Sequence, residues 1–233
     1  MKLLVLFILF FAFTSSGYCQ SEDTTKSKCD YSISADLVSR YVWRGGDFGN
    51  SPAIQPTLQA SCGKFSIGTW GSTSITSFNL QEADLFASFE IWKLKFSCWD
   101  YFYMKMDSST IRNSYFNYSN KETSHDFSFD TEFTWSEDFP LKILASYNFY
   151  GADTLHSSYF EVSYTCQKKV PVEFFAGFTP DKGWYGNGPD FVNIGISIKK
   201  EYEISDKYSI PVYCKLIVNP QKENIFLVAG ITF

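Results

Sequence analysis

The amino-acid sequence predicts an all-β fold, an antiparallel transmembrane β-barrel of about 12 strands with short periplasmic turns and longer extracellular loops. Three observations lead to this class. Apolar and polar residues alternate with period two along most of the chain, the connections between these runs are short and long in turn, and the last alternating run ends at Phe233. Period two is the spacing of side chains on the two faces of a strand.

The composition agrees with strands and excludes several other classes. Aromatic residues make up 19% of the 233 residues, and aromatic side chains favour strands. Charged residues make up only 19%, which argues against a disordered chain or a coiled coil. The formal net charge of −5 offers no basic face, so we expect no nucleic-acid partner.

The amino-terminal segment predicts export from the cytoplasm. Lys2 precedes an apolar run over residues 3–13 and small residues at 15–17, so residues 1–20 are expected to be a cleaved signal peptide. The run is shorter than the roughly 20 apolar residues of a membrane-spanning helix. A lipidated Cys19 is an alternative, disfavoured by the bulky Tyr18. Residues 21–30 are a predicted flexible lead-in, and residues 31–233 a single barrel domain.

The alternating runs define the predicted strands. In the first, Tyr31 and Ile33 share an apolar face, and Ser32 and Ser34 lie opposite. The twelve strands cover residues 31–45, 52–62, 64–73, 81–92, 94–105, 125–135, 141–151, 157–166, 170–179, 190–200, 209–219 and 224–233.

Three residues interrupt this pattern. Asp100 falls on the apolar face of the fifth strand, where a charge facing lipid is costly, so we expect a bulge near Cys98 that turns Asp100 inward. Pro56 and Pro211 lack the N–H that a strand interior needs, which predicts a sheet edge or a bulge at each.

The connections distinguish a membrane barrel from a soluble sandwich. Short ones at 62–64, 92–94, 136–140 and 166–170 alternate with longer ones at 45–51, 74–80, 106–124, 151–156 and 180–191. The link at 200–209 is longer than its place in this series predicts. A Greek-key sandwich has no reason to alternate in this way, whereas an outer-membrane barrel does.

Several segments resemble a known family. They read SRYVWRGG at 39–46, SPAIQ at 51–55, GTWGS at 68–72 and EADLFASFE at 82–90, and they are similar to the TorF-type porin family of Gram-negative bacteria. The similarity covers roughly the first third of the mature chain and does not extend into its middle. The resemblance implies an outer-membrane barrel of porin type and implies no particular substrate.

The polar faces supply candidates for a charged lumen. These are Asp36, Arg40, Arg44, Glu82, Asp84, Asp130, Glu132, Glu161, Glu173 and Lys215. Arg40 and Arg44, two rungs apart on the first predicted strand, could form a constriction that selects solutes. Alternatively, these charges form an ion-pair network that closes the lumen, because a barrel of this size leaves little free space. The surplus of carboxylates favours cations or neutral polar solutes.

Two predicted loops carry aromatic residues. Residues 106–124 include Tyr115 and Tyr118 and form either an inward constriction or an exterior loop. Residues 183–188 include Trp184 and Tyr185, which predict either stacking on a sugar or anchoring at the membrane interface.

Neither an enzymatic site nor a cofactor or metal site is expected. His125 lies between Ser124 and Asp126, but neighbours on a strand point to opposite faces, so no Ser-His-Asp relay forms locally. His125 and His156 are too far apart in sequence to suggest metal-ligand spacing. The mature cysteines, Cys29, Cys62, Cys98, Cys166 and Cys214, are odd in number; we predict no disulfide framework, although an oxidising compartment permits a pair.

These features predict a porin-like channel for passive diffusion of small hydrophilic solutes in the bacterial outer membrane. Its expected partners are outer-membrane lipid, the small polar solutes and the barrel-assembly machinery, for which the strand ending at Phe233 resembles an assembly signal. One alternative is a closed structural or adhesive barrel with a salt-bridged lumen. Another is a soluble secreted β-sandwich that binds carbohydrate, and an enzyme built on a barrel comes last.

Overall fold

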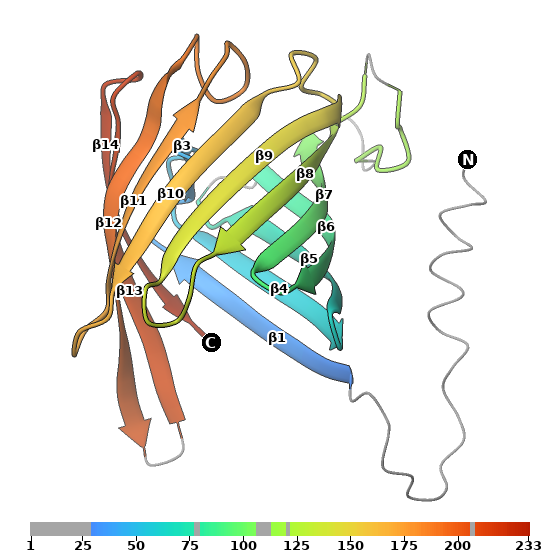
Figure 1. The fold of residues 1–233 in the computed structure, drawn as a ribbon. Helices are drawn as coiled ribbons and strands as arrows, with labels where there is room; N and C mark the ends of the chain where they lie inside the picture. Colours follow the sequence, from blue (N-terminus) through green and yellow to red (C-terminus); the bar gives the residue numbers. More distant parts are fainter. Residues whose placement is uncertain (1–28, 77–79, 106–112, 120–121, 206–207) are drawn as a thin grey trace, which may run out of the picture.

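The computed structural model describes residues 29–76, 80–105, 113–119, 122–205 and 208–233. These residues form a closed antiparallel barrel of 12 strands, together with a two-stranded hairpin (Figure 1). The predicted signal peptide and most of the predicted lead-in lie outside the described residues; Cys29 and Asp30 already belong to the first strand. Among the described residues no helix is long and apolar enough to cross a membrane.

The strands follow the predicted alternating runs closely. Their bounds are β1 (Cys29–Val38), β2 (Val42–Trp43), β3 (Gly46–Asp47), β4 (Ala53–Cys62), β5 (Phe65–Ser74), β6 (Leu80–Ile91), β7 (Leu94–Lys105), β8 (His125–Thr134), β9 (Leu141–Gly151), β10 (Ser158–Cys166), β11 (Val172–Thr179), β12 (Asp190–Ser205), β13 (Tyr208–Asn219) and β14 (Asn224–Thr232). From β4 to β14 each strand pairs with its neighbours in sequence, and β1 closes the ring between β4 and β14.

The two faces of the barrel wall differ as the alternation predicts. Large apolar side chains point outward and stay exposed, for example Tyr31 at 80% and Ile33 at 82%. Polar side chains on the opposite face, such as Ser128 and Asn148, are buried inside the barrel. A soluble sandwich would bury its apolar faces against each other, so the closed barrel excludes that alternative fold.

The first strand is shorter than predicted. β1 ends at Val38, and residues 39–52 fold into the barrel as an inner segment that contains the small hairpin β2–β3 (Figure 1). Arg44 and Gly45 adopt left-handed backbone conformations, with φ of 47° and 74°. A Cβ on Gly45 would lie 1.8 Å from the Val192 carbonyl oxygen, so only glycine allows this approach. The placement of Arg40 and Arg44 on a barrel strand was therefore wrong.

The structure also corrects the predicted link after β12. Strand β12 continues to Ser205 and β13 starts at Tyr208, so the predicted long link is mostly a paired hairpin that extends beyond the neighbouring strands (Figure 1). Pro211 lies at a sheet edge, as predicted, because β14 pairs with β13 only from Val212 onward. Pro56 lies at neither an edge nor a bulge: the β4–β5 pairing skips it without a register shift.

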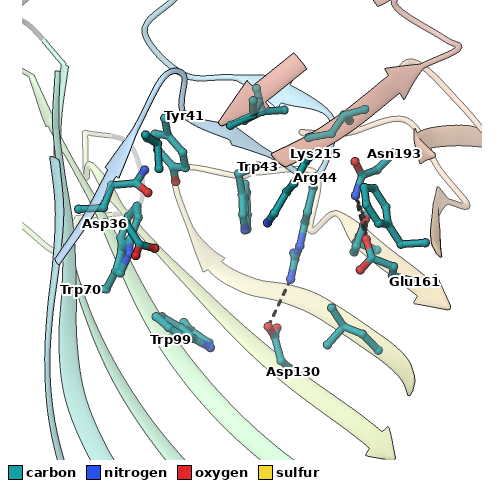
Figure 2. A pocket seen from close by; sticks show the side chains of 18 of the residues that line it. Asp36, Tyr41, Trp43, Arg44, Trp70, Trp99, Asp130, Glu161, Asn193 and Lys215 are labelled. Atoms are coloured by element: carbon teal, nitrogen blue, oxygen red, sulfur yellow. Dashed lines mark hydrogen bonds and ion pairs between the residues drawn. The ribbon is translucent and has the colours of Figure 1, made fainter. Parts of the chain in front are cut away.

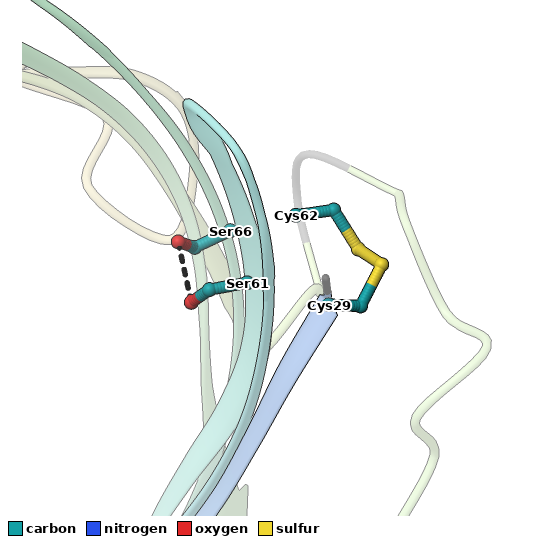
Figure 3. The surroundings of a disulfide bond; sticks show 4 residues. All are labelled: Cys29, Ser61, Cys62 and Ser66. Atoms are coloured by element: carbon teal, nitrogen blue, oxygen red, sulfur yellow. Dashed lines mark hydrogen bonds between the residues drawn. A yellow bond between two sulfur atoms is a disulfide. The ribbon is translucent and has the colours of Figure 1, made fainter. Parts of the chain in front are cut away.

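A disulfide joins β1 to β4. Cys29 and Cys62 face each other in the register and are bonded, on the outer side of the wall, while the Ser61 and Ser66 hydroxyls meet on the inner side (Figure 3). Cys98, Cys166 and Cys214 are free. The structure thus contains one disulfide pair among the described residues, which an oxidising compartment permits, and no larger disulfide framework.

The seam between β1 and β14 is the shortest pairing in the barrel. Only Asp36, Leu37 and Val38 pair with β14, whereas ten residues of β1 pair with β4. Phe233 extends the seam by exchanging backbone hydrogen bonds with Ala35.

Candidate functional site

The inner segment crosses the lumen and packs against the opposite wall. The Trp43 ring lies 5.4 Å from the Tyr101 ring of β7 and 5.7 Å from the Tyr185 ring of the β11–β12 loop. The Tyr41 ring lies 5.4 Å from that of Trp70 on β5. These aromatic contacts fill the half of the lumen nearest the long loops.

Arg44 fastens the inner segment to the wall. Its guanidinium forms an ion pair with Asp130 of β8 at 3.2 Å and donates to the Ser146 hydroxyl at 3.0 Å and the Tyr185 hydroxyl at 2.5 Å (Figure 2). The guanidinium carbon also lies 4.6 Å from the ring centre of Tyr159. The Arg44 and Asp130 side chains are only 7% and 12% exposed, so this pair is largely shielded from water.

The loop that holds Tyr185 completes the packing. Tyr185 is buried against Arg44 and Trp43, and Trp184 stacks on Tyr103. Neither predicted role, sugar stacking or anchoring at the membrane interface, fits a buried Tyr185. Asn219, fully buried, donates from its amide to the Gly45 carbonyl at 3.0 Å and so binds the tip of the inner segment.

Below the inner segment lies a cavity of about 550 Å³. It occupies the half of the lumen nearest the short turns and contains aromatic rings, among them Trp70 and Trp99, beside charged groups (Figure 2). Nine of the ten charged residues singled out in the sequence line it: Asp36, Arg40, Arg44, Asp84, Asp130, Glu132, Glu161, Glu173 and Lys215. With Lys95 the lining carries six carboxylates and four cations.

These charged residues do not form one ring. Arg40 pairs with Asp47 inside the inner segment at 3.0 Å, and Glu132 pairs with Lys142 at 3.6 Å. Glu161 accepts a hydrogen bond from Asn193 at 2.8 Å (Figure 2). The expected constriction of Arg40 and Arg44 on one strand is therefore replaced by separate pairs at different levels.

Glu82, the tenth residue, lies in the wall beneath the inner segment. It shares the inner face of β6 with Asp84, and both side chains are buried. Asp84 accepts the Phe102 N–H at 3.0 Å, which interrupts the backbone pairing of β6 with β7 at this point.

Asp100 lies on the outer face, and the predicted bulge near Cys98 is absent. Strand β7 pairs with β6 and β8 without a register shift, and Asp100 stands opposite the outward residues Leu85 and Phe127. Its carboxylate instead bonds to Nδ1 of the buried His125 at 2.7 Å. A paired and covered carboxylate is tolerated on this face, so no bulge is needed.

The described part of the loop after β7 covers this pair from outside. The Tyr115 carbonyl oxygen lies 2.5 Å from His125 Nε2, and the Tyr118 ring stacks on the His125 ring at 4.3 Å. Residues 113–119 therefore belong to an exterior loop and do not constrict the lumen. His125 of β8 pairs with Asp100 of the adjacent strand β7. It does not form a Ser-His-Asp relay with its sequence neighbours.

Sequence reasoning missed several residues that build the site. Ser146 and Asn219 were not singled out, and Tyr185 was given another role; all three contact the inner segment from distant strands and loops, and no local pattern reveals such contacts. One signal was present: Gly45 and Gly46 interrupt an alternating run, which often marks a tight turn. Among the described residues no group of three His, Cys, Asp or Glu side chains is placed to hold a metal ion.

The fold and the site together define a closed β-barrel whose lumen is partly filled by a segment of its own chain. No protein-family model matches the chain, and no significant match is found among curated proteins. The resemblance to TorF-type porins therefore stays a prediction.

Proposed function

We propose that this protein is an outer-membrane barrel of porin type, a gated channel for small hydrophilic solutes in which the inner segment is the gate. The arrangement of the lumen carries this proposal. A charged cavity of about 550 Å³ is separated from the long-loop end by a chain segment folded in from one connection, not by the wall itself. The inner segment is joined to the barrel strands at its two ends, after β1 and before β4, so it can move without breaking the strand pairing of the barrel.

The outer surface supports a membrane location. Exposed apolar side chains point outward on strands around the barrel, for example Leu58, Phe129, Phe174 and Leu227. A closed barrel satisfies its backbone hydrogen bonds internally, which a lipid environment requires. The resemblance to TorF-type porins and the expected signal peptide add support for a bacterial outer membrane.

The cavity lining supports a preference for cations and neutral polar solutes. Six carboxylates face four cations, and three of those cations, Arg40, Arg44 and Lys95, already pair with carboxylates. A surplus of one charge in a narrow passage attracts the opposite charge.

A closed structural barrel is the second candidate. The tight packing of Arg44 against Asp130, Ser146 and Tyr185 favours it, because a moving gate has to break these contacts. Conductance across a planar bilayer separates the two candidates. A gated channel shows rare openings as the wild type and frequent ones when the inner segment is displaced.

Gly45→Ala is the variant that displaces the segment. The added Cβ would meet the Val192 carbonyl oxygen at 1.8 Å, whereas Gly188→Ala, its matched control, meets nothing within 4 Å. We expect Gly45→Ala to raise the open fraction at least tenfold, and Gly188→Ala to match the wild type. Heat-modifiable migration in detergent gels first confirms that each barrel is folded. A folded Gly45→Ala barrel that never conducts would refute the channel and support the structural barrel.

A further inference from the structure

The barrel surrounds the Arg44 guanidinium with polar and aromatic partners. Asp130 forms the ion pair, and the hydroxyls of Ser146 and Tyr185 accept hydrogen bonds. The guanidinium carbon also lies 4.6 Å from the ring centre of Tyr159 and 5.2 Å from that of Tyr185. A carboxylate, neutral acceptors and aromatic faces suit a flat guanidinium better than a compact ammonium. We call Asp130, Ser146, Tyr159 and Tyr185 the guanidinium site.

The guanidinium site belongs to the barrel and not to the gate. Its four residues lie on β8, β9 and β10 and in the loop after β11. The inner segment contributes Arg44 itself and the Trp43 ring, whose centre lies 4.5 Å from the guanidinium carbon. When the inner segment moves away, the carboxylate, the hydroxyls and two aromatic rings stay behind and lose their cation.

The site keeps its shape through hydrogen bonds that do not involve Arg44. The Asp130 carboxylate accepts from the Ser128 hydroxyl at 3.1 Å, and the Tyr159 hydroxyl accepts from the Asn193 amide at 3.0 Å. Tyr159 is fully buried, so its ring has little freedom to turn. Groups that are already in position bind a ligand at a small cost in ordering. A free guanidinium compound can therefore bind where the Arg44 side chain now lies.

The site is reached from the cavity. Arg44, Asp130 and Tyr159 are part of the cavity lining, and Arg44 points across it to Asp130 (Figure 2). Glu132 and Glu161 line the same space. A surplus of carboxylates raises the local concentration of cationic solutes. A solute that enters the cavity thus meets the guanidinium site.

We propose that the guanidinium site binds solutes that carry a guanidinium group, such as arginine, and that Arg44 occupies it as an internal competitor while the gate is closed. A bound solute keeps Arg44 out of the site, which favours the open arrangement of the inner segment. This inference rests on the proposed function, because it names the solute class of the same channel and the ligand that opens it.

The direct test removes the competitor. Arg44→Ala leaves the site without its guanidinium, and methylguanidinium replaces the missing group. At about 20 mM, with a dissociation constant of about 2 mM, it should raise the temperature at which the heat-modifiable band is lost by about 3–6 °C. If Arg44→Ala folds only when methylguanidinium is present, the result supports the site equally.

Two controls define what this test measures. Methylammonium has the same charge without the planar fork, so it should leave the melting of Arg44→Ala unchanged. The double variant Arg44→Ala/Asp130→Asn lacks the carboxylate and should respond to neither compound. If methylguanidinium has no effect, if methylammonium stabilises equally, or if the double variant responds like Arg44→Ala, the guanidinium site is refuted.

A second experiment uses the wild type in planar bilayers. Free arginine competes there with a tethered Arg44, so a higher concentration is needed. Arginine at about 50 mM should raise the open probability about threefold or more, whereas lysine should not. If methylguanidinium binds Arg44→Ala and Gly45→Ala conducts, but arginine leaves the open probability unchanged, opening by the solute is overturned.

The two experiments separate this inference from the proposed function. If methylguanidinium stabilises Arg44→Ala but neither arginine nor Gly45→Ala produces conductance, the channel is refuted and the guanidinium site stands. If Gly45→Ala conducts but methylguanidinium does not stabilise Arg44→Ala, the channel stands and the guanidinium site is refuted.

Discussion

Replacing Arg44 with Met should destabilise the barrel mainly through the charge that the substitution leaves behind. Asp130 would keep only the Ser128 and Ser146 hydroxyls as donors, in a site where its side chain is 12% exposed. Removing one partner of a buried ion pair costs about 3–5 kcal/mol. Met retains most of the apolar stem of Arg, so the loss of packing adds little.

The size of this effect can be measured by urea unfolding in detergent, followed by tryptophan fluorescence. With a slope of about 2 kcal/mol per molar urea, the midpoint should fall by about 1.5–2.5 M. Arg40→Met is the control: its partner is Asp47, its side chain is 36% exposed, and its loss should cost less than about 1 kcal/mol.

The double variant Arg44→Met/Asp130→Asn provides the decisive comparison. It removes the charge from both partners, so most of the lost stability should return. What remains lost is the contact of the guanidinium with the Trp43, Tyr159 and Tyr185 rings, about 1–2 kcal/mol. If the double variant is no more stable than Arg44→Met, the uncompensated charge is not the cause. Equal losses in Arg44→Met and Arg40→Met would also refute the reasoning.

Three further predictions address the wall, the outer loop and the cavity. Cys29→Ser should lower the stability by about 4 kcal/mol, because the disulfide closes a loop with a sequence separation of 33, whereas Cys98→Ser should match the wild type in urea unfolding. Asp100→Asn should weaken the contact of His125 with the outer loop, so limited proteolysis should cut near Tyr115 faster while the barrel stays folded; an unchanged rate would contradict this role. Glu173→Lys should shift the reversal potential of the open channel toward anions, and an unchanged potential would exclude Glu173 from the conducting path.

The barrel strands could be predicted from the sequence because the two sides of the wall differ chemically. Each strand between β4 and β14 carries an alternation that fixes which face is polar, and strand bounds followed within a few residues except at the β12–β13 hairpin. The same alternation predicts that Asp84, Asp130 and Glu161 face the interior, and all three line the cavity.

The alternation gave a wrong prediction where the backbone leaves the sheet while apolar and polar residues continue to alternate. Tyr41 and Trp43 continue the apolar period of β1, yet their side chains pack inside the barrel because the chain turns inward after Val38. The local sequence pattern shows only the period of the apolar residues. It does not show that Tyr101 and Tyr185 lie across the lumen, where the inner segment packs against them. At Asp100 the alternation was right and the predicted bulge was wrong, because its partner His125 lies on the next strand and the residues that cover it lie in a loop.

Because the seam between β1 and β14 is short, the barrel wall should separate there first. Strand β1 shares ten residue pairs and a covalent bond with β4 but only three pairs with β14. Sideways stress on the barrel wall would therefore concentrate between β1 and β14. Since the chain passes from the end of β1 straight into residues 39–52, the same stress would pull on the segment that partly fills the lumen.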